Sequence, residues 1–126
     1  MSRLAQSIQD MEVYQAAFKL QQDIFVMTKR LPPEERYSLT DQIRRSSRSI
    51  GANLSEAWAK RRYPAHFLSK LTDADGELQE TVHWIRSAAA CAYWSEAEAR
   101  QLNEQAAVVG RLLGSTINNS ESFCTR

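Results

Sequence analysis

The hydrophobic positions of this chain recur every three or four residues in four successive stretches, with polar residues between them. This is the spacing of amphipathic α-helices that each bury one side. The stretches run from about 11 to 30, 38 to 62, 64 to 92 and 96 to 118. No sustained alternation of apolar and polar residues indicates a strand. The pattern predicts an all-α protein, an antiparallel up-down-up-down four-helix bundle.

Prolines and capping residues mark the ends of the predicted helices. Pro32 ends the first helix, because proline lacks the amide donor and restricts the residue before it. Ser38 is the expected N-cap of the second helix, and Pro64 suits the first turn of the third. Ser95 and Glu98 form a capping box, which starts the fourth helix.

Length and composition are those of one small globular domain. The chain has 126 residues, of which 43% are hydrophobic and 25% charged. No apolar run approaches the roughly 20 residues of a membrane helix, and the first residues lack a signal-peptide core. We expect a cytoplasmic protein without membrane association. We divide it into an N-terminal segment over 1–10, the bundle over 11–118 and a flexible polar tail over 119–126.

The two cysteines are too few for a disulfide framework or a metal site. Cys91 lies in an alanine-rich run, which predicts a small buried residue. Cys124 lies in the polar tail, which predicts a free thiol.

Several polar residues of the second helix lie next to its apolar seam. Unpaired polar groups there would cost roughly 1–3 kcal/mol each, so they need partners, which we expect among the acidic residues of the third helix. Such pairs set the register of packed helices more than they add stability. The predicted structural network consists of Gln42, Arg45, Asn53, Glu56, Glu77 and Glu80, with Asp73 beside it. Small residues from Ser46 to Ala52 also predict close approach of another helix.

Positive charge is concentrated in the first half of the chain. Residues 1–62 hold 11 Lys/Arg and 7 Asp/Glu, whereas the rest hold 5 and 8. This asymmetry favours an anionic partner or pairing between the two halves. Arginines contact phosphates through charge-assisted hydrogen bonds. The candidate RNA- or DNA-binding residues are Arg44, Arg48, Lys60, Arg61 and Arg62, and the alternative is that they are ordinary solvated charges.

Aromatic residues exceed what a narrow helical core requires. Aromatic side chains outside a core often mark interfaces, although periodicity alone leaves core edges as the alternative. The interface candidates are Tyr14, Phe18, Phe25, Trp58, Trp84 and Trp94.

Two enzyme-like patterns are incomplete. Glu80 and His83 have the Glu-x-x-His spacing of a di-iron bundle, but the second such motif is missing, so we expect no metal and no cofactor. Arg61 and His66 have a spacing used by small helical ribonucleases, with arginine as phosphate clamp and histidine as acid or base. Pro64 lies between them. We expect no catalytic residues and keep the ribonuclease as an alternative.

Several short motifs, most of them in the second predicted helix and beside it, form a recognisable signature: Val13–Tyr14–Gln15–Ala16, Leu31–Pro32, Glu35, Tyr37, Gln42–Ile43–Arg44–Arg45–Ser46, Ser49–Ile50, Asn53–Leu54, Ser55–Glu56, Gly76–Glu77–Leu78 and Glu80–Thr81. With this signature the chain resembles a known family, the four-helix-bundle proteins of 23S ribosomal RNA intervening sequences. Two positions depart from the family pattern: Ala57 stands where glycine is usual, and Tyr63 precedes Pro64 where serine or threonine is usual.

This resemblance implies an oligomeric scaffold. Some members assemble into ring-like pentamers, and the similar accessory protein of diversity-generating retroelements binds nucleic acid and a reverse transcriptase. Most members have no established activity. We therefore expect a non-enzymatic scaffold or adaptor, a ring-like homo-oligomer and pentamer, that binds RNA or DNA through the second helix and contacts a partner such as a reverse transcriptase. The alternative is a protein-assembly module without nucleic-acid affinity.

Overall fold

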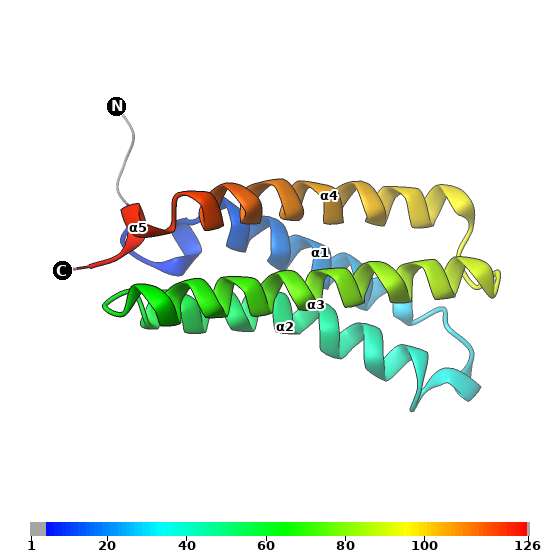
Figure 1. The fold of residues 1–126 in the computed structure, drawn as a ribbon. Helices are drawn as coiled ribbons and strands as arrows, with labels where there is room; N and C mark the ends of the chain where they lie inside the picture. The colour runs from blue at the N-terminus through cyan, green and yellow to red at the C-terminus, as the bar shows by residue number, and fades with distance from the viewer. Residues whose placement is uncertain (1–4, 126) are drawn as a thin grey trace.

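The structure, a computed structural model, describes residues 5–125 and is built from helices, without a strand in that range (Figure 1). Four long helices lie side by side, and each contacts two of the others: α1 and α3 both pack against α2 and α4. The all-α prediction is confirmed. The elements are η1 Ile8–Asp10, α1 Glu12–Thr28, η2 Pro33–Glu35, α2 Leu39–Ala59, α3 Pro64–Ala90, α4 Glu96–Asn118 and α5 Ser120–Phe123.

The connections between helices lie at the two ends of the molecule. The η2 turn and the α3–α4 connection lie at one end, whereas η1, the α2–α3 turn and α5 lie at the other (Figure 1). Residues 1–4 and 126, which belong to the predicted N-terminal segment and tail, lie outside the described residues. We call the second end, with η1 and α5, the terminal end.

The core is made by one apolar face of each long helix. The seam of α1 is Val13, Ala17, Leu20 and Ile24, and all four side chains are buried. Burying a large aliphatic side chain contributes roughly 1.5–3 kcal/mol, so the seams supply the main stabilisation. The other seams include Ile43, Ile50 and Leu54 on α2, Leu71, Leu78 and Ile85 on α3, and Leu102, Val109 and Leu113 on α4.

The closest packing is between α2 and α3. Ser46 and Ser47 are buried, and the Thr81 hydroxyl lies 3.0 Å from the Ser46 hydroxyl while also donating to the Glu77 carbonyl at 2.8 Å. Because both hydroxyls are satisfied inside the molecule, neither imposes the cost of an unpaired buried group. The predicted close approach at this small-residue stretch is confirmed.

Ser38 is the N-cap residue of α2, as predicted, but its own side chain accepts no capping hydrogen bond, and that bond is supplied by Glu35. Its carboxylate accepts the Leu39 amide at 3.3 Å and the Ser38 hydroxyl at 2.6 Å. The same carboxylate accepts the Tyr93 hydroxyl at 2.9 Å, which ties the start of α2 to the end of α3. The Ser38 hydrogen bond, followed by those of Tyr93 and Leu39, lowers the pKa of Glu35, and the bond to Glu35 raises the pKa of Tyr93 to about 12.

The capping box of α4 is confirmed and is extended by an ion pair. Ser95 accepts the Glu98 amide at 3.1 Å, and Glu98 accepts the Ser95 amide at 2.9 Å. Arg30 also forms an ion pair with Glu98. The hydrogen bond from Arg30, followed by the Ser95 amide, lowers the pKa of Glu98 to about 2.

Trp94 is a core residue, so its assignment to an interface is wrong. The chain leaves α3 through Ala92, whose φ of 60° reverses the backbone, with the Tyr93 amide bonded to the Ala88 carbonyl at 3.0 Å. This turn folds Trp94 back under α1. Its side chain is 2% exposed, and its indole nitrogen donates to the Met27 carbonyl at 3.2 Å.

The remaining corrections concern the cysteines and the tail. Cys91 caps the end of α3 and is exposed, because α3 ends one residue before it; the prediction that it is buried is wrong. Cys124 has a free thiol, as predicted. The segment predicted as a polar tail contains the short helix α5, whose Phe123 ring lies 6.3 Å from that of Phe67.

Candidate nucleic-acid interface

Three cations surround one aromatic ring where α1 meets α2. The charged groups of Lys29, Arg44 and Arg48 lie 4.9, 4.8 and 5.4 Å from the centre of the Phe25 ring. We call Phe25, Lys29, Arg44 and Arg48 the cationic cluster. Two of these cations, Arg44 and Arg48, were predicted to bind nucleic acid, and Phe25 was predicted at an interface. The structure brings the two predictions together on one surface.

The helical spacing of both elements produces this arrangement. Lys29 follows Phe25 by four residues, and Arg48 follows Arg44 by four, so each pair lies on one side of its helix. A hydrogen bond also fixes the Arg44 guanidinium, because its Nε donates to the Thr28 hydroxyl at 2.8 Å. Thr28 is buried and donates in turn to the Phe25 carbonyl at 2.7 Å. Arg44 is thus fixed in one orientation with its terminal nitrogens left over.

The cationic cluster carries uncompensated positive charge. Within residues 5–125, none of its three cations forms an ion pair with a carboxylate. Each cation–aromatic contact contributes about 0.5–1 kcal/mol at an exposed site, but the like charges repel one another. An incoming anion removes that repulsion. The cluster is therefore suited to contact phosphate groups.

Arg45, the residue beside Arg44, has the opposite surroundings. Its guanidinium donates to Glu77 at 3.0 Å and to Glu80, both on α3. Glu80 also accepts the indole nitrogen of Trp84 at 3.2 Å. The structure thus places Arg45 in the ion pair with Glu77 and Glu80 that the sequence predicts. It joins two helices rather than facing an external partner.

The rest of the predicted polar network is divided. Glu56 pairs with Lys70 at 3.0 Å, and Lys70 lies 3.8 Å from Asp73. Asn53 instead donates to the Ser49 carbonyl of its own helix at 2.8 Å, because that carbonyl is within reach one turn away. Within residues 5–125, no hydrogen bond joins Gln42 or Asn53 to α3, so the single network across the two helices is wrong for these two residues. Gln42 is half-buried.

The second basic group, Lys60, Arg61 and Arg62, lies in the turn after α2, far from the cationic cluster. Sixteen positions of helix separate Arg44 from Lys60, about 24 Å at 1.5 Å per residue. Arg61 turns back onto its own helix: its guanidinium lies 3.6 Å from the centre of the Trp58 ring, and its Nε donates to the Trp58 carbonyl at 2.9 Å. The one basic surface predicted on helix two is two separate regions.

The other predicted interface aromatics differ in exposure. Tyr14 and Phe18 stack with ring centres 6.1 Å apart, and the Phe18 side chain is 45% exposed. Trp58 is half-buried beneath Arg61, and Trp84 is half-buried beside Glu80. Their role at an interface stays a prediction.

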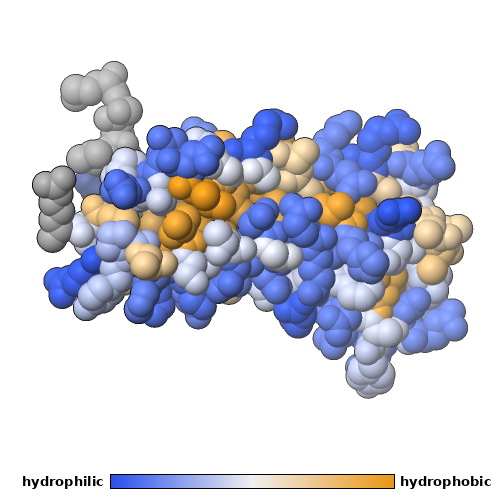
Figure 2. Space-filling view, viewed as in Figure 1, coloured by the Kyte–Doolittle hydropathy of each residue, from blue (hydrophilic) through white to orange (hydrophobic). Residues whose placement is uncertain are grey.

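An apolar surface between α3 and α4 was missed. Figure 2 shows apolar side chains at the surface along the junction of these helices. A hollow of about 500 Å³ there is lined by Val82, Ala89, Ala106 and Gly110 among others, and Val108 of α4 is 37% exposed. Lys29 was missed too, although its spacing from Phe25 is a signal that the sequence contains.

The two enzyme-like patterns are placed as follows. Within residues 5–125 there is no group of three or more His, Cys, Asp or Glu side chains that could hold a metal ion. The His83 ring lies 4.8 Å from the Trp84 ring. His66 packs against Tyr63, with ring centres 5.7 Å apart, whereas Arg61 packs against Trp58. The contacts of these residues do not join Arg61 to His66.

No helix in the described part of the chain is both long enough and apolar enough to cross a membrane.

Comparison with known proteins identifies the family. One solved structure, a protein of unknown function of the S23 ribosomal protein family from Bacteroides thetaiotaomicron VPI-5482, is 29% identical with a TM-score of 0.75. The match covers 83% of this chain and 97% of that one. Among curated proteins, none matches. The family model described as 23S rRNA-intervening sequence protein matches residues 9–115. The chain therefore belongs to the family of 23S rRNA-intervening sequence proteins.

Proposed function

We propose that this protein is a non-enzymatic, self-associating helical scaffold that contacts RNA or DNA through the cationic cluster. One observation carries the proposal: three cations gather around Phe25 without a carboxylate partner within residues 5–125. Some other cations do find acidic partners, as Arg45 and Lys70 do. The like charges of the cationic cluster repel one another, and a bound polyanion offsets that repulsion.

Arg44 is the central residue of this surface. Its Nε is occupied by Thr28 and its face by Phe25, so its terminal N–H groups are the donors available to a phosphate. Arg48 and Lys29 are exposed beside it and add charge without fixed geometry. Contacts of this kind read the phosphate backbone and carry no base specificity. We expect affinity that is sensitive to salt and tolerant of sequence.

Self-association would multiply this weak contact. The proposal is an antiparallel up-down-up-down bundle that assembles into a ring-like pentamer in the cytoplasm, as the family resemblance implies. The apolar surface between α3 and α4 supports a protein contact there, because patches of this kind mark interaction sites. Repeating the cationic cluster around a ring raises the overall affinity without any new contact. Lys60 and Arg62 would add charge at the terminal end, and a reverse transcriptase is a candidate protein partner.

The test is a binding titration against a matched pair of variants. Fluorescence anisotropy measures the affinity for a labelled single-stranded RNA and DNA at low and moderate salt. Arg44→Gln combined with Arg48→Gln is expected to weaken binding about tenfold or more, since each charge-assisted contact contributes roughly 1.5–3 kcal/mol. It should also reduce the slope of log K against log salt by about 1.4, or about 0.7 per lost phosphate contact on a single strand. The native mass, recorded with absorbance at 260 nm, reports the oligomer and any co-purified nucleic acid.

The control is Arg45→Gln, which removes one positive charge from the position next to Arg44. Its partners are Glu77 and Glu80, so nucleic-acid affinity should stay within about twofold of the unmodified protein. Equal losses in both variants would indicate a general charge effect and refute the cationic cluster as the binding surface.

A second candidate is a pure assembly module, which the apolar surface between α3 and α4 favours. It predicts a stable oligomer that binds neither RNA nor DNA at low salt. A monomer would contradict both candidates.

A further inference from the structure

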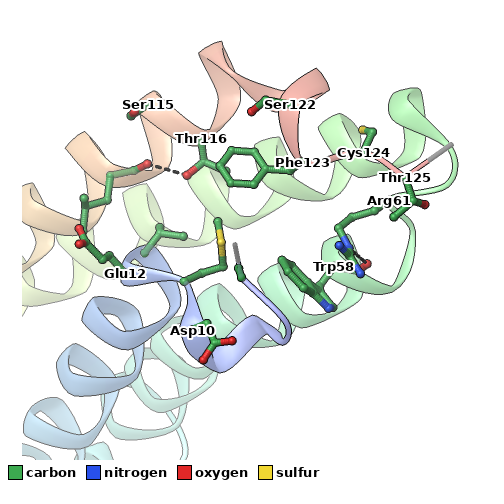
Figure 3. Close-up of a pocket in the computed structure, with 14 residues that line it drawn as sticks. Asp10, Glu12, Trp58, Arg61, Ser115, Thr116, Ser122, Phe123, Cys124 and Thr125 are labelled. Atoms are coloured by element: carbon green, nitrogen blue, oxygen red, sulfur yellow. Dashed lines mark hydrogen bonds between the residues drawn. The ribbon is translucent and has the colours of Figure 1, made fainter. Parts of the chain in front are cut away.

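A cavity of about 630 Å³ lies at the terminal end of the molecule (Figure 3). The start of α1, the end of α2, the end of α4 and the C-terminal segment each contribute to its wall. In Figure 3, Trp58 reaches it from α2, Arg61 from the turn after α2, and Phe123 from α5. Small-molecule sites usually have volumes of about 300–1,000 Å³, so this cavity is of ligand size.

The C-terminal segment is held in place as one wall. The Thr125 amide donates to the Arg61 carbonyl at 3.1 Å, and Phe123 packs against Phe67 of α3. These contacts join the C-terminal segment to the α2–α3 turn and to α3. The cavity is thus lined by residues near both ends of the described part of the chain.

The Arg61 side chain is held in one orientation and has hydrogen-bond donors available for an anion. Its guanidinium stacks on Trp58 at 3.6 Å, and its Nε is used by the Trp58 carbonyl. Within residues 5–125 it forms no ion pair with a carboxylate. Its terminal N–H donors therefore remain for a ligand, in the planar geometry that matches a carboxylate or phosphate group. Since stacking already restricts the side chain, binding loses little further conformational freedom.

The other residues that line the cavity determine which kind of ligand fits beside Arg61. Met11, Val13, Leu112 and Phe123 offer apolar surface, so the part of the ligand away from Arg61 is apolar or aromatic. Two carboxylates, Asp10 and Glu12, also line the cavity and disfavour a second negative group. The Asp10 carboxylate already accepts the amides of Gln6 at 2.9 Å and Ser7 at 3.2 Å, just before η1.

We propose that this cavity binds a small organic anion, with one carboxylate or phosphate group on Arg61 and an apolar or aromatic body against Leu112 and Phe123. This site is separate from the cationic cluster, and the proposal does not depend on nucleic-acid binding.

The test is a nuclear magnetic resonance titration of the full, isotope-labelled protein with three probes that share one body: 2-naphthoate, 2-naphthyl phosphate and neutral 2-naphthalenemethanol. We expect saturable shifts at the Trp58 indole N–H and the Arg61 Nε–H with at least one of the two anions. Arg61→Gln should weaken anion binding about tenfold or more, since hydrogen bonds to charged groups are the strong ones. The same variant should change the affinity for the neutral alcohol less than twofold. The two anions show which head group fits.

Two controls locate the effect. Arg62→Gln removes an equal charge from the next residue, which does not line this cavity, and should leave anion binding unchanged. Arg44→Gln with Arg48→Gln should also leave it unchanged, which separates this site from the proposed nucleic-acid surface. The proposal is overturned if no probe binds saturably, if shifts gather around Phe25, or if Arg61→Gln binds the anions as tightly as the unmodified protein.

Discussion

Arg44 and Arg45 are adjacent in the sequence but lie in opposite electrostatic surroundings. Arg45 joins two glutamates of α3, so its charge is neutralised inside the protein. Arg44 lies over Phe25 with Lys29 and Arg48 nearby, and within residues 5–125 it forms no ion pair with a carboxylate. Successive residues of a helix point about 100° apart, so neighbouring side chains meet different partners. The side of the helix on which an arginine lies, and not its residue type, decides whether it forms ion pairs within the protein or remains available to an external anion.

The largest expected effect on nucleic-acid affinity comes from giving Arg44 a carboxylate neighbour, as Arg45 already has. Arg48→Glu places a carboxylate one turn from Arg44 and close to Lys29. Nucleic-acid affinity should fall roughly 10- to 100-fold, since a charge-assisted contact is lost and a repulsive one gained. The free energy of unfolding should rise by no more than about 0.2–0.5 kcal/mol, the range for an ion pair one helical turn apart.

Anisotropy titration and urea denaturation measure these two quantities. Arg111→Glu, the same change on an exposed position of α4, is the control for net charge. An equal fall in nucleic-acid affinity in both variants would show a general charge effect and would contradict a special role for the surroundings of Arg44.

Acidification should next distinguish the capping carboxylates Glu98 and Glu35 from the cationic cluster. The pKa values of Glu98, about 2, and of Glu35 lie below their usual value of 4.5 in the folded protein. Their stabilising contribution is complete above about pH 4.5 and is lost as the pH falls towards the folded pKa values. Urea midpoints at pH 7, 4 and 3 should therefore decrease, and less steeply in Glu98→Gln.

The cationic cluster should behave differently, because it contains no carboxylate or imidazole group. Nucleic-acid affinity should be constant from pH 7 to pH 5. A midpoint that does not change between pH 7 and pH 3 would contradict the role given to Glu98 and Glu35.

A smaller difference is expected between alanine variants of α2. Arg45→Ala should lower the free energy of unfolding by about 1 kcal/mol, because it removes two partly exposed ion pairs and leaves Glu77 facing Glu80. Arg48→Ala should change it by less than about 0.5 kcal/mol, since a lost aromatic contact is offset by reduced repulsion. Equal losses in urea denaturation would show that both arginines are structural.

The smallest effect tests how closely α1 packs on α2. A methyl group added at Gly51 would meet Gln21 and Tyr14 at 3.6 Å, an ordinary contact distance. Gly51→Ala should therefore raise the free energy of unfolding by about 0.5–1 kcal/mol through helix propensity. Gly76→Ala, where nothing lies within 4 Å, is the control and should give a similar gain. A loss at Gly51 with a gain at Gly76 would show tighter packing on this side.

The local features of the fold could be predicted from the sequence. Seams such as Val13–Leu20–Ile24 and caps such as Ser95–Glu98 depend on residues within one or two turns, and the structure confirms them. Trp94 and Cys91 could not be placed, because their burial depends on the direction in which the chain leaves α3. The pairing of Arg45 was predicted, whereas the cationic cluster needs α1 and α2 side by side, a contact between distant segments.

The backbone at Ala92 has a consequence for the order of folding. A φ of 60° costs an alanine about 1 kcal/mol that glycine would not lose. The α3–α4 turn is therefore not favoured by its own sequence, and it is held by distant contacts, Tyr93 to Glu35 and Trp94 to Met27. We infer that this turn forms late, after α1 and η2 are in place. Ala92→Gly should then slow unfolding more than it speeds folding, and the opposite ratio in stopped-flow kinetics would place the native turn before the rate-limiting step.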